Sequence, residues 1–111
     1  MIERGSGCIN LIGSSSGLVG RAEHVNLAVG QFGLRALSQG LARARWPAGI
    51  HIAHGVVDAD MHEPGRLPDG DPKADPAPIA ELIAAIHRQP RSAWSREVDV
   101  RPFDEKFWQH C

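Results

Sequence analysis

The densest group of chemically capable side chains is a serine-rich loop, Gly13-Ser14-Ser15-Ser16-Gly17, which follows a short apolar run. Its pattern matches G-x-S-x-G, the turn that presents the nucleophilic serine in one class of hydrolases. In those hydrolases the turn leads directly into a helix. In this sequence Gly17 and Gly20 would stand in the first turns of that helix, where each glycine costs about 1 kcal/mol relative to alanine. A glycine–serine turn is the preferred interpretation, and a serine hydrolase stays as a minor alternative.

Two histidines, His51 and His54, resemble a metal-binding pair, but they lie three residues apart in an apolar segment. On a β-strand this spacing directs them to opposite faces, so they cannot share one ion. Asp58, Asp60 and His62 would converge only if the strand continued, and a solvated loop is favoured there. These patterns predict no metal site.

The two cysteines, Cys8 and Cys111, lie near opposite ends of the chain and form no C-x-x-C motif. One disulfide between them is possible, but two reduced thiols are favoured because the sequence shows no secretory features. The first residues lack the apolar stretch of a signal peptide, and no apolar run approaches the roughly 20 residues of a membrane span. We therefore expect a cytoplasmic protein that does not bind membranes.

Composition narrows the chemistry further. The 111 residues carry a net charge of −1 and include no tyrosine, and lysine occurs only at Lys73 and Lys106. This charge gives no basic surface for nucleic acid, and a mechanism that needs a tyrosine phenol is excluded. The glycines at 13, 17 and 20 do not follow the G-x-G-x-x-G spacing of dinucleotide-binding loops, and no G-K-[ST] sequence marks a P-loop.

The elements that must position these residues alternate between strands and helices. Residues 8–12 and 50–57 are apolar runs typical of buried strands, and the second is apolar on both faces, as in a parallel sheet covered on both sides. Residues 97–101 alternate polar and apolar side chains and predict an edge strand. Residues 58–74 form a polar loop rich in Pro, Gly and Asp.

Two helices are predicted between these strands. The longer runs from Val25 to Trp46, and the shorter follows Asp75, a plausible N-cap, and stops at Pro90. The long helix has one apolar stripe expected to face the core: Leu27, Leu34, Leu37, Leu41 and Ala44. A second face is made mostly of small residues and would allow close approach of a neighbouring helix: Val29, Phe32, Gly33, Ala36 and Gly40. The arginines of the long helix are expected to face solvent: Arg35, Arg43 and Arg45.

These elements predict one α/β domain over residues 1–111. The order strand, helix, strand, helix, strand is that of a three-stranded parallel sheet with a long helix and a shorter C-terminal helix.

Several segments are distinctive in combination. They are the strand Ile9-Asn10-Leu11-Ile12 with its serine loop, Gln31-Phe32-Gly33-Leu34-Arg35-Ala36-Leu37, Gly49-Ile50-His51-Ile52-Ala53-His54, and the tails His87-Arg88-Gln89-Pro90-Arg91-Ser92-Ala93-Trp94 and Glu97-Val98-Asp99-Val100-Arg101-Pro102. Together they resemble the C-terminal half of a short-chain dehydrogenase/reductase. The resemblance implies a partial Rossmann-like fold and a truncated chain, because the family's glycine-rich cofactor loop would lie before Met1.

The resemblance also assigns site positions. Anchoring on residues 32–37 places the family's catalytic lysine at Gln31, its tyrosine at Leu27 and its serine at Ser14, so the serine is retained and the other two are replaced. Asp58 and Ala59 fall where family members line the nicotinamide pocket, usually with a Pro-Gly or similar small turn.

The resemblance therefore implies a degenerate short-chain dehydrogenase-like protein without redox activity of its own. The alternative is that the chain is part of an NAD(P)-dependent oxidoreductase that acts on a carbonyl or alcohol. The rest of that enzyme would come from a longer reading frame or from a complete partner protein of the family. We expect no tightly bound cofactor, although the family uses NAD(P). The long helix belongs to a dimer interface in the family, so we expect a homo-oligomer through Val25–Trp46.

Overall fold

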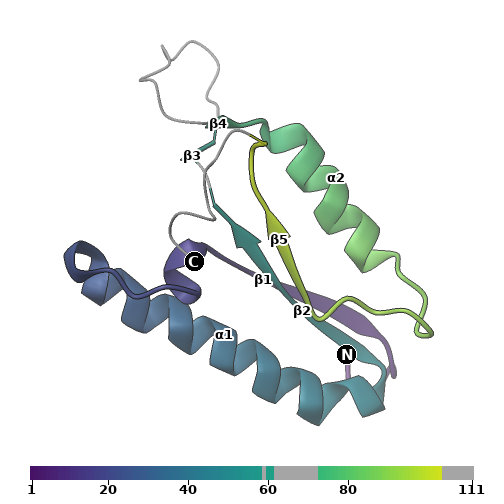
Figure 1. Ribbon diagram of the computed structural model, residues 1–111. Helices are drawn as coiled ribbons and strands as arrows, with labels where there is room; N and C mark the ends of the chain where they lie inside the picture. The colour runs from purple at the N-terminus through teal and green to yellow at the C-terminus, as the bar shows by residue number, and fades with distance from the viewer. Residues whose placement is uncertain (59, 62–72, 104–111) are drawn as a thin grey trace.

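The computed structural model describes residues 1–58, 60–61 and 73–103 of the chain. Three strands form a parallel sheet in the order β1-β2-β5: β1 (Gly7–Gly13), β2 (Ile50–Val57) and β5 (Glu97–Val100). Helix α1 (Val25–Arg45) covers one face, and α2 (Pro76–His87) covers the other (Figure 1). The predicted α/β fold with its three-stranded sheet is confirmed.

Each of these elements begins and ends for a local reason. Asp75 caps α2 by accepting a hydrogen bond from the Ala77 amide at 3.1 Å, and Pro76 stands in the first turn. Helix α1 passes into a 3₁₀ turn, Trp46–Ala48, which ends at Gly49 in the left-handed region with φ 84°. That glycine reverses the chain into β2.

The polar loop differs from the expectation in one respect. It contains two short strands, β3 (Asp60–Met61) and β4 (Lys73–Ala74), which pair in parallel as a separate two-stranded sheet. The serine loop also holds a 3₁₀ turn, Ser15–Gly17, and a second turn, Ala22–His24, precedes α1.

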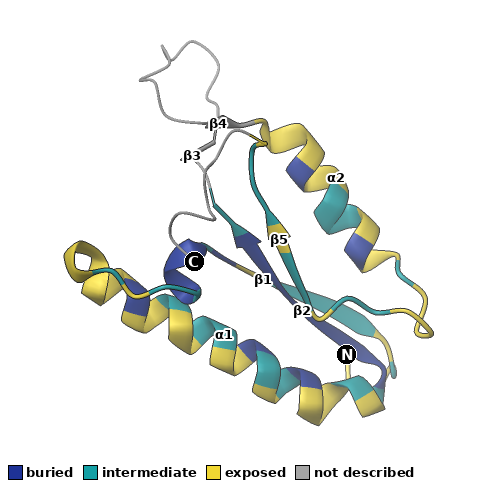
Figure 2. Cartoon of the chain, in the orientation of Figure 1, coloured by how far each residue is buried: buried dark blue, intermediate teal, exposed yellow. Residues whose placement is uncertain are grey.

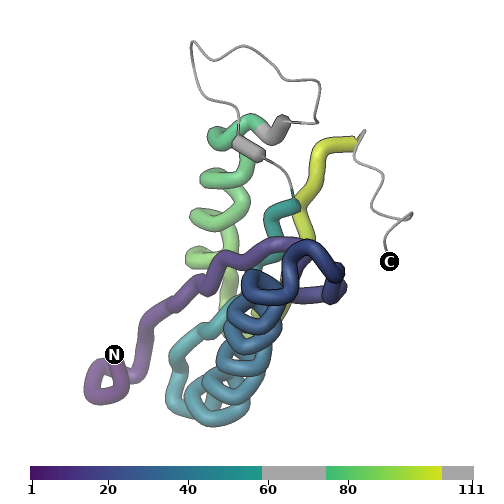
Figure 3. The backbone as a smooth tube through the Cα atoms, turned by 90° about the vertical axis from the view of Figure 1, so that its left-hand side faces the viewer, coloured from purple at the N-terminus to yellow at the C-terminus, as the bar shows by residue number. Residues whose placement is uncertain are grey.

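The core lies along β2, whose residues 50–56 are all buried. Side chains alternate between its faces, and on the α1 side Ile50 and Ile52 pack with Ala42. Figure 3, turned from the first view, shows the two helices on either side of the strands. The sheet is thus a middle layer between α1 and α2.

The predicted apolar stripe of α1 is only partly correct. The buried residues of the helix are Ala28, Ser38 and Ala42, whereas Leu27 and Leu37 are 47% and 52% exposed. Ala44 is exposed as well, and Leu34 and Leu41 are half-buried. Small side chains face the sheet because they let the helix backbone approach it closely, and the exposed side of α1 is visible in Figure 2.

Candidate functional site

Ser14 and Gln31 lie together at the carboxyl end of β1. The Ser14 backbone amide donates a hydrogen bond to Oε1 of Gln31 at 3.0 Å. Ser14 follows β1 directly, and Gln31 lies in the second turn of α1. The link therefore ties the start of the serine loop to the helix, and it joins two of the three positions that the sequence singled out.

Two glycines make this contact possible. A Cβ atom at Gly13 would lie 2.7 Å from Oε1 of Gln31 and 3.1 Å from Nε2 of His54. At Gly17 a Cβ would lie 3.0 Å from the Gln31 carbonyl oxygen. Both glycines are buried, so they allow the loop to pack closely on the helix and the strand.

The serine loop does not present a nucleophile. The middle residue of its G-x-S-x-G pattern, Ser15, is 6% exposed, and its Oγ accepts a hydrogen bond from Arg21 at 3.5 Å. The chain then runs on to Val25 before the helix begins. This geometry differs from a strand that turns straight into a helix with an exposed serine, and it argues against the hydrolase alternative.

Leu27, one helical turn before Gln31, is 47% exposed. Its side chain is a hydrocarbon, so it can neither donate nor accept a proton. The two positions that the sequence resemblance assigns to the family's lysine and tyrosine thus hold an amide and an alkyl group.

A partly buried charged network lies behind the Ser14–Gln31 contact. Arg35 of α1 donates two hydrogen bonds to the Glu97 carboxylate, at 2.8 and 2.9 Å. Nδ1 of His54 lies 2.9 Å from the same carboxylate. Arg35 is thus a member of an ion pair between helix and sheet, and its prediction as a solvated residue is wrong.

The network determines which ring nitrogen of His54 donates a hydrogen bond. A carboxylate accepts hydrogen bonds, so Nδ1 of His54 carries a proton and donates it to Glu97. The opposite nitrogen, Nε2, is buried and has no hydrogen-bond partner among the residues that the structure describes. It is directed toward Gly13 and Gln31, where the neighbouring Oε1 is also an acceptor.

The arginine dominates the electrostatics of Glu97. The hydrogen bonds from Arg35 hold the pKa of the Glu97 carboxyl below its ordinary value of 4.5, burial opposes this, and the contact with His54 lowers the pKa further. Glu97 is therefore ionised at neutral pH, and its charge is matched by Arg35.

The two histidines lie on opposite faces of β2, as the spacing predicts. His51 contacts Cys8 and Trp94, whereas His54 contacts Glu97 on the α1 side. Burial raises the pKa of the Cys8 thiol, which is free, and Cys111 lies outside the described residues. Within the ranges 1–58, 60–61 and 73–103, no group of three or more His, Cys, Asp or Glu residues is placed to hold a metal ion.

Asp58, at the end of β2, is already engaged. Its carboxylate forms an ion pair with Arg101, which also binds Asp99. The Asp58 amide donates to the Val100 carbonyl oxygen at 3.1 Å, so the turn is tied to β5. The other predicted cofactor-binding residue, Ala59, lies outside the described residues, as does His62.

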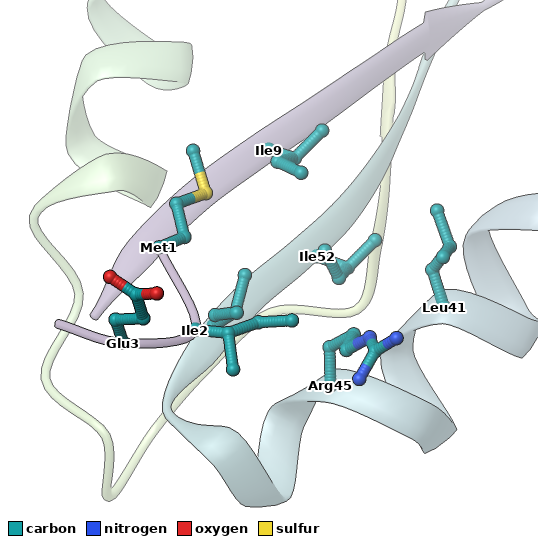
Figure 4. Close-up of a pocket in the computed structure, with 8 residues that line it drawn as sticks. Met1, Ile2, Glu3, Ile9, Leu41, Arg45 and Ile52 are labelled. Atoms are coloured by element: carbon teal, nitrogen blue, oxygen red, sulfur yellow. The ribbon is translucent and has the colours of Figure 1, made fainter. Parts of the chain in front are cut away.

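An apolar hollow of about 470 Å³ lies at the other end of the sheet, away from Ser14. Figure 4 shows Ile9 and Ile52 from the strands and Leu41 from α1 around it, with Met1 and Ile2 at its edge. It lies on the α1 side of the sheet, where Leu41 and Arg45 of the helix form part of its wall. None of the predicted site residues lines this hollow.

No described helix is long and apolar enough to cross a membrane.

The fold defines a class: it is similar to part of the structure of short-chain dehydrogenases. A short-chain dehydrogenase from Rhodopseudomonas palustris has a similar structure, with a TM-score of 0.75 and 32% identity over 93% of this chain. Acetoin dehydrogenase YohF from Salmonella typhimurium matches with a TM-score of 0.74 and 16% identity over 90% of this chain. The chain spans 42% and 45% of the lengths of these two proteins. No family model and no curated protein sequence matches the chain.

Sequence reasoning missed Glu97 and His54 as members of one network. The sequence did contain a signal for the orientation of Glu97. Residues 97–101 alternate polar and apolar side chains, so Glu97 and Val98 must face opposite sides of the sheet. Val98 lies on the α2 side, so Glu97 faces α1. The register that pairs His54 with Glu97 came only from the structure.

Proposed function

We propose that this chain is a short-chain-dehydrogenase-like module that does not transfer hydride by itself and that associates with a second copy through α1. The observation that carries the first part is the hydrogen bond from the Ser14 amide to Oε1 of Gln31. The amide oxygen accepts this bond, which a lysine ammonium cannot do because it has only donors. Gln31 therefore supports the loop instead of activating an acid.

The chemistry of the family requires more than the retained serine. By resemblance, its tyrosine exchanges a proton with the substrate oxygen, and its lysine lowers the phenol's pKa from about 10 toward working pH. Leu27 and Gln31 supply neither function. The loss of a positioned acid or base alone costs a factor of about 10²–10⁴, so the residues present do not fit a working hydride-transfer site.

Dinucleotide binding is expected to be weak for a related reason. Affinity for NAD(P) in such folds depends on a glycine-rich turn that places the pyrophosphate at a helix N-terminus. These 111 residues contain no glycine spacing of that kind. The Asp58 carboxylate, at the predicted nicotinamide position, is paired with Arg101.

A turnover assay tests this part of the proposal. The purified chain is incubated with NADH or NADPH and a panel of aldehydes and ketones, and nicotinamide absorbance is followed with time. We expect no enzyme-dependent loss of absorbance. A steady loss that scales with protein and disappears in Ser14→Ala would overturn the proposal and support the alternative, an oxidoreductase component acting on carbonyls.

The second part of the proposal rests on the exposed face of α1. Five large apolar residues of this helix are well exposed: Val25, Leu27, Val29, Phe32 and Leu37. Between them, a Cβ atom at Gly30, Gly33 or Gly40 would meet nothing within 4 Å, so a partner can approach the backbone there. A helix of 21 residues is about 30 Å long, enough for symmetric pairing with a second copy.

The open edge of β1 and the hollow beside it add to the apolar surface that association would cover. Within the described part of the chain, β1 pairs only with β2. An unpaired strand edge offers N–H and C=O groups to another chain, and each buried apolar Å² contributes about 25 cal/mol.

Light scattering coupled to size exclusion tests the association. We expect a mass of about twice the 12.0 kDa monomer. The double variant Val29→Glu/Phe32→Glu should run as a monomer, because it places two charges in the apolar face. Ala80→Glu adds a charge at an exposed position of α2, on the opposite face of the sheet, and should leave the mass unchanged. A monomeric wild type, or a double variant of unchanged mass, would refute pairing through α1.

A further inference from the structure

A second hollow, of about 320 Å³, lies at the amino-terminal ends of β1 and β2. Its walls come from three parts of the chain: the residues before β1, the Gly49 turn and the segment that follows α2. The residues that matter for its chemistry are Arg4, Ser6, His51, His87, Arg91 and Trp94. It is the opposite end of the sheet from Ser14.

The floor of this hollow is rigid and planar. His51 is 2% exposed, and its ring stacks on Trp94 with centroids 4.6 Å apart and an interplanar angle of 3°. Nε2 of His51 donates to the Ser95 carbonyl oxygen at 2.7 Å. The Trp94 indole donates to the carbonyl oxygen of Gln89 at 3.2 Å. Both rings are therefore held in place by hydrogen bonds as well as by stacking.

The two arginines are held by the backbone at the mouth of the hollow. Nη2 of Arg91 donates to the Gly5 carbonyl oxygen. Gly49 has a positive φ of 84°, and a side chain there would collide with both groups of this contact. Nε of Arg4 donates to the backbone oxygen and the hydroxyl of Ser6, both at 3.3 Å.

The positive charge of the hollow is not neutralised by a carboxylate. Arg35 and Arg101 form ion pairs with acidic residues, whereas in residues 1–58, 60–61 and 73–103 neither Arg4 nor Arg91 does. No acidic side chain is among the residues that line the hollow. Glu3, the acidic residue next to Arg4 in sequence, lines the apolar hollow instead.

We propose that this hollow binds a phosphate group, either as the free anion or as part of a small phosphomonoester. Guanidinium groups match phosphate oxygens with paired, charge-assisted hydrogen bonds. The volume of about 320 Å³ lies at the lower end of the range of small-ligand sites. The hydroxyl of Ser6 and the ring of His87 supply further polar groups at the rim. The site is independent of the Ser14 region and of the α1 face.

Titration of the ¹⁵N-labelled 111-residue chain tests this site. The probes are inorganic phosphate and glycerol phosphate, at constant ionic strength set with chloride. We expect saturable amide shifts at Ser6, Gly7 and Gly49 and a saturable shift of the Trp94 indole N–H signal. Tighter binding of glycerol phosphate would assign the site to an ester, and equal binding would assign it to the free anion. Both outcomes support a phosphate site.

Variants make the test specific. Arg4→Gln and Arg91→Met should each weaken binding about tenfold or more, because each removes charge-assisted hydrogen bonds. Arg43→Gln removes an exposed arginine of α1 outside the hollow and should leave the affinity unchanged. Arg91→Lys keeps the charge and a donor for Gly5, and it should bind with intermediate affinity. The proposal is overturned if phosphate causes no saturable shift, or if Arg43→Gln weakens binding as much as Arg4→Gln.

Discussion

The substitution Glu97→Gln should destabilise the fold by removing the central charge of the network that Glu97 forms with Arg35 and His54. Glu97 accepts two hydrogen bonds from Arg35 and one from His54, all between 2.8 and 2.9 Å. Hydrogen bonds to charged groups contribute about 1.5–3 kcal/mol each. Glutamine can keep the oxygen that accepts from His54 and from Nε of Arg35, but its NH₂ group then faces the Nη2 donor of Arg35 and cannot accept from it.

Solvent reduces this effect. The side chains of Arg35 and Glu97 are 31% and 20% exposed, so water screens part of the interaction. We therefore expect the free energy of unfolding to fall by about 2 kcal/mol near neutral pH. Asp99→Asn is the matched control on the same strand. Its side chain is 45% exposed, and the loss should be below about 1 kcal/mol.

The pH dependence follows from the lowered pKa of Glu97. A carboxyl whose pKa is lower in the folded state contributes its full stability above the unfolded value of 4.5 and loses it as the pH falls through the folded value. The difference between wild type and Glu97→Gln should therefore be constant above about pH 5 and shrink below about pH 4.

Urea unfolding at a fixed protein concentration, repeated across this pH range, measures both effects. Equal stability of Glu97→Gln and Asp99→Asn near neutral pH would refute this role of the Glu97 charge. So would a difference from wild type that stays constant at acidic pH.

Two further substitutions test the local packing. Gly13→Ala places a Cβ 2.7 Å from Oε1 of Gln31 and should lower the free energy of unfolding in urea by about 1–3 kcal/mol. Gly20→Ala is the control, because a Cβ there meets nothing within 4 Å, and it should leave the stability unchanged. Equal effects of the two variants would show that the loop has room to move. Asp75→Ala removes the N-cap bond to Ala77 and should lower the unfolding free energy by about 1 kcal/mol, with no loss expected for Asp75→Asn; an unchanged Asp75→Ala would contradict the cap.

The strands and helices of the domain could be predicted from local patterns. The apolar run of residues 50–57 was recognised as a two-sided parallel strand because both faces are buried by helices. The limits of α2 followed from Asp75 and Pro90, which act through cap geometry and a missing amide hydrogen. These signals are local and need no knowledge of the neighbours.

The face of α1 that packs on the sheet could not be predicted in the same way. Leucine spacing favoured Leu27 and Leu37, but close packing selected Ala28 and Ser38. Burial on this helix depends on how near the sheet lies, which the helix sequence does not contain. The leucines left outside add to the exposed apolar surface of α1 that the proposed association would cover.

The candidate site was also predicted in part. The resemblance placed Ser14 and Gln31 at related positions, and the structure shows their side-chain–backbone hydrogen bond. The ion pair between Arg35 and Glu97 could not be predicted from the sequence, because the two residues lie 62 positions apart. Long-range pairs of this kind depend on strand register, which single-sequence patterns do not specify.

Gln31 supports the serine loop through an acceptor oxygen, a role that a lysine cannot fill. Hydrogen exchange of the Ser14 amide tests this directly in wild type, Gln31→Lys and Gln31→Glu. We expect the amide to be protected in wild type and in Gln31→Glu, which keeps an acceptor, and to lose its protection in Gln31→Lys. Equal protection in the lysine variant would contradict the claim, because it would show that the Gln31 oxygen does not hold the loop.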